Sequence, residues 1–326
     1  MKSEGIPEKL PIWGECIPYN TGKSKREVMK INNLPGLLQL LGTLRDTFGT
    51  KIARSSTYFD TQTWRAGIRK GLEQATFSDI PTLTLYPVKG SCFAVILSPG
   101  GGFYSKGLKP EGYDQARELN KRGISAFVLD YRINPYRAPV YWLDLQRAVR
   151  YVRFHADDLG VAGNEIGTVG FSAGGYVTGA EALLIDDVPP QAEGYTPDAI
   201  DHVSGRPDFM GLIYPVTGFT RNPSMLSVLT GEDFFDAAKR PVLQRRYNLK
   251  NHLDGFVPPL FLAYGDKDPL KDMLDFAFEA EKRGLPLKKL IVSGASHGFL
   301  GVKDGHERWM NEFSAWLKST CGGEER

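Results

Sequence analysis

Cysteine is scarce in this chain of 326 residues, which contains only Cys16, Cys92 and Cys321. An odd number of widely separated cysteines does not predict a disulfide framework, and their spacing is not that of a metal site. We therefore expect a protein that works without a metal ion or any other cofactor.

Long apolar runs and an excess of one charge are missing as well. No stretch approaches the ~18 apolar residues of a membrane span, and the N-terminal MKSEGIPEKLPIWGE lacks the apolar core of a signal peptide. The 40 basic and 38 acidic residues nearly cancel, so the charge does not predict binding to nucleic acid or to a membrane surface. The expectation is a soluble cytoplasmic protein that acts on a small molecule.

Short apolar runs alternate with helical patterns from about residue 93 onward. Strands are expected at 93–98, 124–130, 166–170, 209–214, 259–264 and 287–292. Helices are expected at 110–123, 140–155, 271–283 and 305–318. This alternation predicts an α/β fold with a mostly parallel sheet covered by helices on both faces. Ligands of such sheets bind at the carboxyl ends of the strands.

Three segments do not follow the pattern. Residues 1–80 are interpreted as an N-terminal extension and residues 81–320 as the catalytic domain. The leucine-rich stretch 34–48 is more apolar than one helix face requires. It could be a helix packed on the domain, a lid or cap over the site, or the contact of a homodimer. Residues 180–208 and 217–257 lack convincing strands and are interpreted as insertions near the site.

The sequence TVGFSAGGYV places Ser172 between Gly170 and Gly174. In a sharp turn from a strand into a helix, a side chain at either glycine position would collide with neighbouring backbone, so G-x-S-x-G is typical of a nucleophile elbow. The alternative is a glycine-rich loop with a chance serine. The context described next favours the elbow, with Ser172 as the nucleophile.

A serine nucleophile needs a base, and the base needs an acid that orients it. Among five histidines, His297 follows the last expected strand, which fits the chain order of serine, acid and histidine. The loop after the preceding strand, FLAYGDKDPL, offers Asp268 and Asp266. Asp268 is the preferred acid because its distance from Gly265 lets the loop turn back, and Asp266 is the alternative.

Backbone donors for an oxyanion are expected in SPGGGF, directly after the strand 93–98. We assign the N–H groups of Gly101 and Gly102, together with that of Ala173 after the nucleophile. A glycine run can instead cradle phosphate, but no G-K-S/T follows it here.

In this order the segments resemble one family, the α/β-hydrolase esterases of the hormone-sensitive-lipase-like and acetylxylan-esterase-like group. The resemblance covers about residues 80–318 and is carried by DIPTLTLYPV, SPGGGF, LDYRINPY, GFSAGG, DAIDHVSGRPDF, YGDKDPL and ASHGF. It implies the α/β-hydrolase fold, a Ser172, Asp268 and His297 triad, and oxyanion donors at Gly101, Gly102 and Ala173. Pro99 replaces the histidine of the lipase H-G-G-G motif, as is common in the acetylxylan-esterase-like branch, and residues 20–79 match nothing in the family.

These features predict a serine carboxylesterase or acetylesterase (EC 3.1.1). The resemblance further implies a short acyl group, such as acetyl on a carbohydrate. An amidase or peptidase of the same fold is the alternative, although the chain has no room for the propeller of prolyl oligopeptidases. A non-catalytic ligand-binding protein on this scaffold is a third hypothesis, and such proteins typically lose a triad member.

Overall fold

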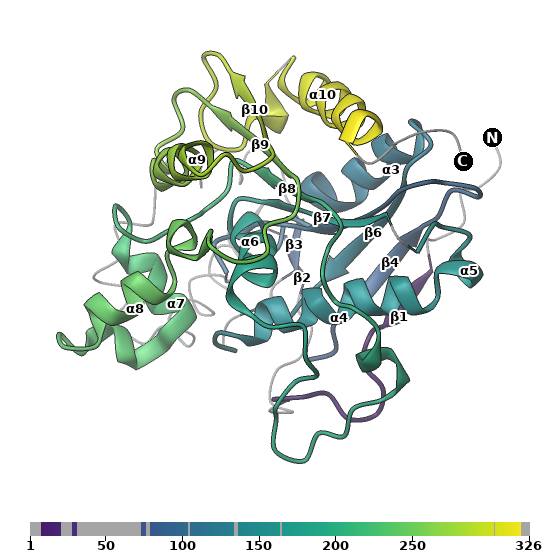
Figure 1. Ribbon diagram of the computed structural model, residues 1–326, viewed down its shortest axis with the longest axis horizontal. Helices are drawn as coiled ribbons and strands as arrows, with labels where there is room; N and C mark the ends of the chain where they lie inside the picture. The colour runs from purple at the N-terminus through teal and green to yellow at the C-terminus, as the bar shows by residue number, and fades with distance from the viewer. Residues whose placement is uncertain are drawn as a thin grey trace.

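A sheet of eight strands forms the centre of the molecule (Figure 1). The computed structural model describes residues 8–20, 28–30, 73–75, 79–103, 105–133, 136–163, 165–302 and 304–320. The strands, in chain order, are β1 (Lys9–Pro11), β4 (Thr82–Tyr86), β5 (Ala94–Ser98), β6 (Ser125–Asp130), β7 (Ile166–Phe171), β8 (Met210–Ile213), β9 (Leu260–Gly265) and β10 (Leu287–Val292). Two further strands, β2 (Val28–Lys30) and β3 (Glu73–Ala75), form a separate antiparallel pair.

The strand order across the sheet is β1-β4-β6-β5-β7-β8-β9-β10. From β6 to β10 the neighbours are parallel, whereas β4 is antiparallel to both β1 and β6. All six strands expected from the sequence lie in the parallel part. The antiparallel strands β1 and β4 were not among the expected ones. The sheet is therefore mostly parallel, as predicted, with an antiparallel edge.

Helices cover both faces of the sheet (Figure 1). On one face lie α3 (Asp114–Asn120) and α10 (Gly305–Thr320), and on the other lie α4 (Val140–Phe154), α6 (Ala173–Leu184) and α9 (Asp272–Lys282). The central strands supply both cores; in β5, for example, Val95 and Leu97 face α3 and α10 whereas Ile96 faces the opposite layer. This division follows from the two-residue period of a strand.

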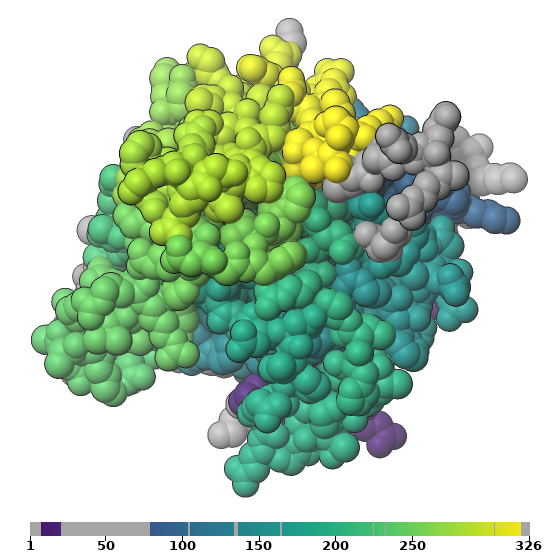
Figure 2. Space-filling model, viewed as in Figure 1, coloured from purple at the N-terminus to yellow at the C-terminus, as the bar shows by residue number. Residues whose placement is uncertain are grey.

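The remaining helical segments are short. They are the π-helix η1 (Lys109–Tyr113), the α-helices α5 (Ala156–Leu159), α7 (Leu226–Thr230) and α8 (Arg240–Arg246), and the 3₁₀ turns η2 (Ala199–His202), η3 (Pro223–Met225), η4 (Gly231–Phe235), η5 (Leu249–His252) and η6 (Phe299–Gly301). Figure 2 shows α7 and α8 as a green lobe that projects from the body. Among the described helices, none combines the length and the apolar character needed to cross a membrane.

The two predicted insertions leave the sheet at opposite ends of its strands. Both are within the described part of the chain and contain helical turns and loops but no strand. The loop 185–208 connects the end of α6 to the start of β8, so it lies at the amino ends of the strands, away from the expected site. Its placement near the site was therefore wrong. Residues 217–257 leave the carboxyl end of β8, so this segment does begin on the side of the expected site.

Residues 8–20 pack on the main sheet and its helices. Strand β1 pairs with β4, and the Trp13 indole N–H donates to Asp144 Oδ1 at 2.9 Å. Arg147 Nε donates to the carbonyl of Ile12 at 2.8 Å. The division into an N-terminal extension, residues 1–80, and a catalytic domain, residues 81–320, stays a prediction, although β1 already belongs to the main sheet. The leucine-rich stretch 34–48 lies outside the described residues, so its lid, packing and dimer interpretations stay predictions.

Candidate active site

Ser172 lies at a sharp turn between β7 and α6. Its φ of 51° and ψ of −116° are rare for a residue with a side chain, and this strain turns the chain from strand to helix within one residue. A Cβ on Gly170 would lie 2.1 Å from the Gly174 carbonyl oxygen, and a Cβ on Gly174 would lie 2.0 Å from that of Ser98. Glycine is thus required at both positions, for the steric reason inferred from the sequence.

A chain of hydrogen bonds runs from Ser172 to Asp268. Ser172 Oγ lies 2.8 Å from His297 Nε2, and His297 Nδ1 lies 2.9 Å from Asp268 Oδ2. Asp268 is fully buried, and its Oδ1 accepts the Leu270 N–H at 2.8 Å. Because an ionised carboxylate only accepts, the hydrogen of neutral His297 is assigned to Nδ1. Nε2 is then free to accept the Ser172 hydroxyl hydrogen.

Asp266 has a different position, although it is only two residues away. Its side chain is exposed, and Oδ1 accepts the Gly294 N–H at 2.8 Å while Oδ2 lies 3.4 Å from Ser293 Oγ. Asp266 therefore stabilises the turn that follows β10 and does not contact His297.

The other histidines form separate contacts. His155 lies beside Asp158, His252 bonds the Arg246 carbonyl, and His202 is exposed. His306 Nε2 lies 2.9 Å from Gln115 Oε1, and burial lowers the pKa of this histidine. Of the five, His297 is the one that lies beside Ser172.

The glycine loop after β5 packs directly against the elbow. A Cβ on Gly100 would lie 2.8 Å from the Cβ of Ser172, and Gly101 and Gly102 have positive φ values of 145° and 65°. The Tyr131 hydroxyl fixes the loop from behind by donating to the Pro99 carbonyl at 2.7 Å. In the part of the chain that the structure describes, the N–H groups of Gly101, Gly102 and Ala173 have no acceptor. They are therefore available to a ligand oxygen.

Two residues beside this loop were not identified from the sequence. Glu111, in η1, accepts hydrogen bonds from the Gly100 N–H at 2.7 Å and from the Tyr214 hydroxyl at 2.8 Å. In the sequence Glu111 is an acidic residue in the first turn of a helix, a common position for glutamate. Tyr214 follows a buried strand, and its neighbours in the sequence give no pattern that would indicate a functional residue either. Their association depends on a contact between distant parts of the chain.

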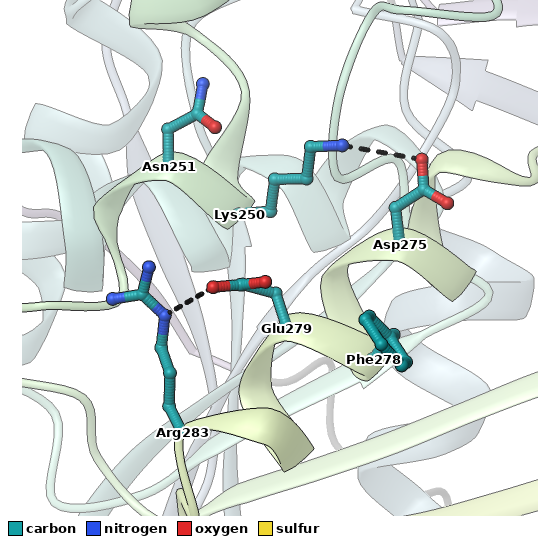
Figure 3. Close-up of a pocket in the computed structure, with 6 residues that line it drawn as sticks. All are labelled: Lys250, Asn251, Asp275, Phe278, Glu279 and Arg283. Atoms are coloured by element: carbon teal, nitrogen blue, oxygen red, sulfur yellow. Dashed lines mark hydrogen bonds and ion pairs between the residues drawn. The ribbon is translucent and has the colours of Figure 1, made fainter.

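A separate surface hollow of about 620 Å³ lies between η5 and α9 (Figure 3). Its charged side chains pair with one another: Lys250 Nζ lies 3.5 Å from Asp275 Oδ2, and Arg283 Nε donates to Glu279 Oε1 at 2.9 Å. No residue of the predicted site lines this hollow. It therefore does not belong to the arrangement around Ser172.

Comparison with known proteins finds one matching family model and several relatives that are named as esterases. The model of a family described as BD-FAE matches residues 86–274, which is more than half of the chain. Endo-1,4-beta-xylanase B of Butyrivibrio fibrisolvens is 30% identical over 266 residues, covering 77% of this chain and 38% of the xylanase. An acetylxylan esterase of Xylanibacter ruminicola is 26% identical over 250 residues, covering 73% of this chain and 48% of that protein. The chain thus spans less than half the length of these two relatives.

Solved structures share the fold. An acetyl ester-xyloside bifunctional hydrolase from Caldicellulosiruptor lactoaceticus aligns with a TM-score of 0.65 and 31% identity, over 74% of this chain and 88% of that one. An esterase from Thermogutta terrifontis aligns with a TM-score of 0.59 and 23% identity, over 75% and 91% of the two chains. The predicted α/β-hydrolase fold is confirmed, as is the resemblance to the esterase group.

Proposed function

This chain belongs to the BD-FAE family, and on that premise we propose that it is a serine esterase that hydrolyses carboxylic esters without a cofactor. The observation that carries the proposal is the hydrogen-bonded series of Ser172, His297 and Asp268. This series lies beside a glycine loop with free N–H groups. The nucleophile, the base, the orienting acid and the oxyanion donors needed for acyl transfer are thus all available.

The reaction begins when Nε2 of His297 takes the hydroxyl proton of Ser172. The serine oxygen attacks the ester carbonyl, and the N–H groups of Gly101, Gly102 and Ala173 stabilise the negative charge on the carbonyl oxygen. His297 then gives its proton to the departing alcohol, while Asp268 stabilises the imidazolium. A water molecule releases the acid from Ser172 by the same sequence of proton transfers.

We propose a short acyl group, in particular acetyl on a carbohydrate, as the substrate. The names of two relatives support this class, since one is an acetylxylan esterase and one an acetyl ester-xyloside hydrolase. A cytoplasmic location and a homodimer made by residues 34–48 accompany this proposal as sequence-based hypotheses. Cell fractionation and light scattering on the purified chain test these two hypotheses.

The proposal is tested with p-nitrophenyl esters from acetate to decanoate, acetylated xylo-oligosaccharides and a peptide amide. We expect the highest kcat/KM for acetyl esters and no cleavage of the amide. The Ser172→Ala variant should fold normally and keep only residual catalysis, roughly 10³–10⁴ over water, as is typical when a triad nucleophile is removed. Near wild-type turnover by this variant, or preferential amide cleavage, would contradict the proposal.

A further inference from the structure

Glu111 lies directly behind the glycine loop and contacts it through backbone and side chain. Its own N–H donates to the Gly107 carbonyl at 3.0 Å, and the Gly107 N–H in turn donates to the Gly100 carbonyl at 2.8 Å. Its Oε2 accepts the Gly100 N–H at 2.7 Å. The N–H group of Gly100 is therefore held by Glu111, and its carbonyl by Gly107, whose own carbonyl accepts the Glu111 N–H. The next two residues of the loop are the proposed oxyanion donors Gly101 and Gly102.

The second carboxylate oxygen of Glu111 connects to the other half of the site. Oε1 accepts the Tyr214 hydroxyl at 2.8 Å, so both oxygens act as acceptors, the pattern of an ionised carboxyl group. Burial raises the pKa of Glu111, and the bonds from Tyr214 and Gly100 together with the charge of His297 oppose that rise. A positive charge on His297 thus favours the ionised form of Glu111.

Tyr214 lies between Glu111 and His297. It directly follows β8, and its φ of 37° is unusual for a residue with a bulky side chain. The Tyr214 ring is buried and meets the His297 imidazole edge to face, with the ring centres 5.2 Å apart. Burial raises the pKa of the phenol well above its usual value, so the hydroxyl keeps the proton that it donates to Glu111.

We propose that Glu111 is a positioning residue of the esterase reaction, holding the glycine loop through the Gly100 N–H and orienting His297 through Tyr214. The inference rests on the proposed function. One carboxylate thereby connects the oxyanion donors with the general base, two parts of the site that come from opposite sides of the elbow. A displacement of about 1 Å in such groups can cost on the order of 10² in rate, so this support affects the reaction although Glu111 touches no reacting atom.

Two conservative substitutions test the Glu111 carboxylate and the Tyr214 hydroxyl separately. Glu111→Gln keeps the size of the side chain, and its amide oxygen can still accept the Gly100 N–H while the charge is lost. Tyr214→Phe removes the hydroxyl and leaves the ring against His297. We expect each variant to lower kcat by about 10- to 100-fold, the range typical of residues that orient metal ligands, which we adopt for a residue that orients a base. KM should stay within about twofold, because neither side chain is proposed to contact substrate.

The double variant Glu111→Gln with Tyr214→Phe tests whether the two residues act as one unit. If they do, it should be at most about threefold slower than the slower single variant, since coupled residues are not additive. The matched controls are Glu181→Gln, the same change at a buried carboxyl on α6, and Tyr195→Phe, which removes a hydroxyl bonded to Asp201. Both controls should keep kcat within about twofold, as expected for residues away from the reacting groups.

Thermal unfolding of every variant distinguishes positioning from stability, because a merely structural Glu111 would lower Tm and leave the kcat of the folded protein unchanged. Wild-type kcat in Glu111→Gln and Tyr214→Phe would overturn the inference, and so would a change confined to KM. Multiplicative losses in the double variant would overturn the link through Tyr214. If Glu111→Gln does not fold, Tyr214→Phe decides by the same criterion. An inactive, folded wild type would instead overturn the proposed function, and the inference with it.

Discussion

The Asp268→Asn substitution should be far more damaging than its small size suggests, because the surroundings fix the orientation of the new amide. Asp268 Oδ1 accepts the Leu270 N–H at 2.8 Å, and Oδ2 faces His297 Nδ1 at 2.9 Å. In the asparagine variant the carbonyl oxygen must take the Leu270 position, since an NH₂ there would oppose an N–H donor. The NH₂ group then points at Nδ1 of His297.

This orientation would invert the tautomer of the histidine. Nδ1 would become the acceptor, so the hydrogen would move to Nε2, the atom 2.8 Å from Ser172 Oγ. An Nε2–H cannot take the proton of Ser172, and no carboxylate would stabilise an imidazolium. The corresponding change in a well-studied triad lowers kcat by about 10⁴. We expect a loss of that order, which corresponds to about 5.5 kcal/mol of transition-state stabilisation.

The assay is kcat and KM for p-nitrophenyl acetate, with thermal unfolding to establish that the variant is folded. Asp266→Asn is the matched control, because the same chemical change two residues away affects an exposed turn residue. It should keep kcat within about threefold, as is usual for surface substitutions. A folded Asp268→Asn within tenfold of wild type would refute the reasoning, and a larger loss in Asp266→Asn would show that the acid is misassigned.

Three further predictions concern packing, pH and the N-terminal stretch. Gly174→Ala should reduce stability by at least about 1–3 kcal/mol and abolish activity, since its Cβ would lie 2.0 Å from the Ser98 carbonyl oxygen; wild-type melting of this variant would contradict the elbow geometry. Burial raises the pKa of Glu181 well above its usual value, so the folded state keeps a proton that the unfolded state releases, and stability falls as pH rises from the unfolded pKa through the raised folded one. The Tm of Glu181→Gln should therefore lie above that of wild type at about pH 8 and close to it near pH 4. A Tm difference between the two proteins that is the same at every pH would contradict this prediction. Leu38→Asp and Leu41→Asp should shift the acyl-chain preference if residues 34–48 form a pocket wall, whereas a shift to monomer in size-exclusion chromatography with an unchanged preference would favour the dimer contact.

The sequence predicted best the features that depend on local geometry. Ser172 could be identified because its turn excludes side chains at Gly170 and Gly174, and that requirement is visible within five residues. His297 and Asp268 could be identified because both follow strands of one parallel sheet. The structure brings these three side chains into one hydrogen-bonded series, and their catalytic roles stay predictions until the variants are measured.

The features that the sequence did not predict depend on contacts between distant segments. Strand β1 has three residues, too few for a visible alternation, and pairs with β4 more than 70 positions away. The alternating TLTLY of β4 carries a strand signal, so this strand could have been predicted from the sequence. Glu111 and Tyr214 are 103 positions apart, and neither has a local pattern that distinguishes it from an ordinary helix or strand residue.

The order of the strands places Tyr214 between the segments that carry Ser172 and His297. Across the sheet, β5, β7, β8, β9 and β10 are consecutive neighbours, and their carboxyl ends supply in turn the glycine loop, Ser172, Tyr214, Asp268 and His297. The loop that follows β10 must therefore cross back over β9 and β8, a span of roughly 14 Å at about 4.8 Å per strand, to bring His297 to Ser172 at the end of β7. A Cβ on Gly265 of β9 would lie 2.1 Å from the Ala295 carbonyl oxygen of this loop. Asp268 fixes the imidazole at Nδ1, and Tyr214, which follows the strand in between, gives the ring a second contact. Glu111 accepts the Tyr214 hydroxyl on the far side of that contact.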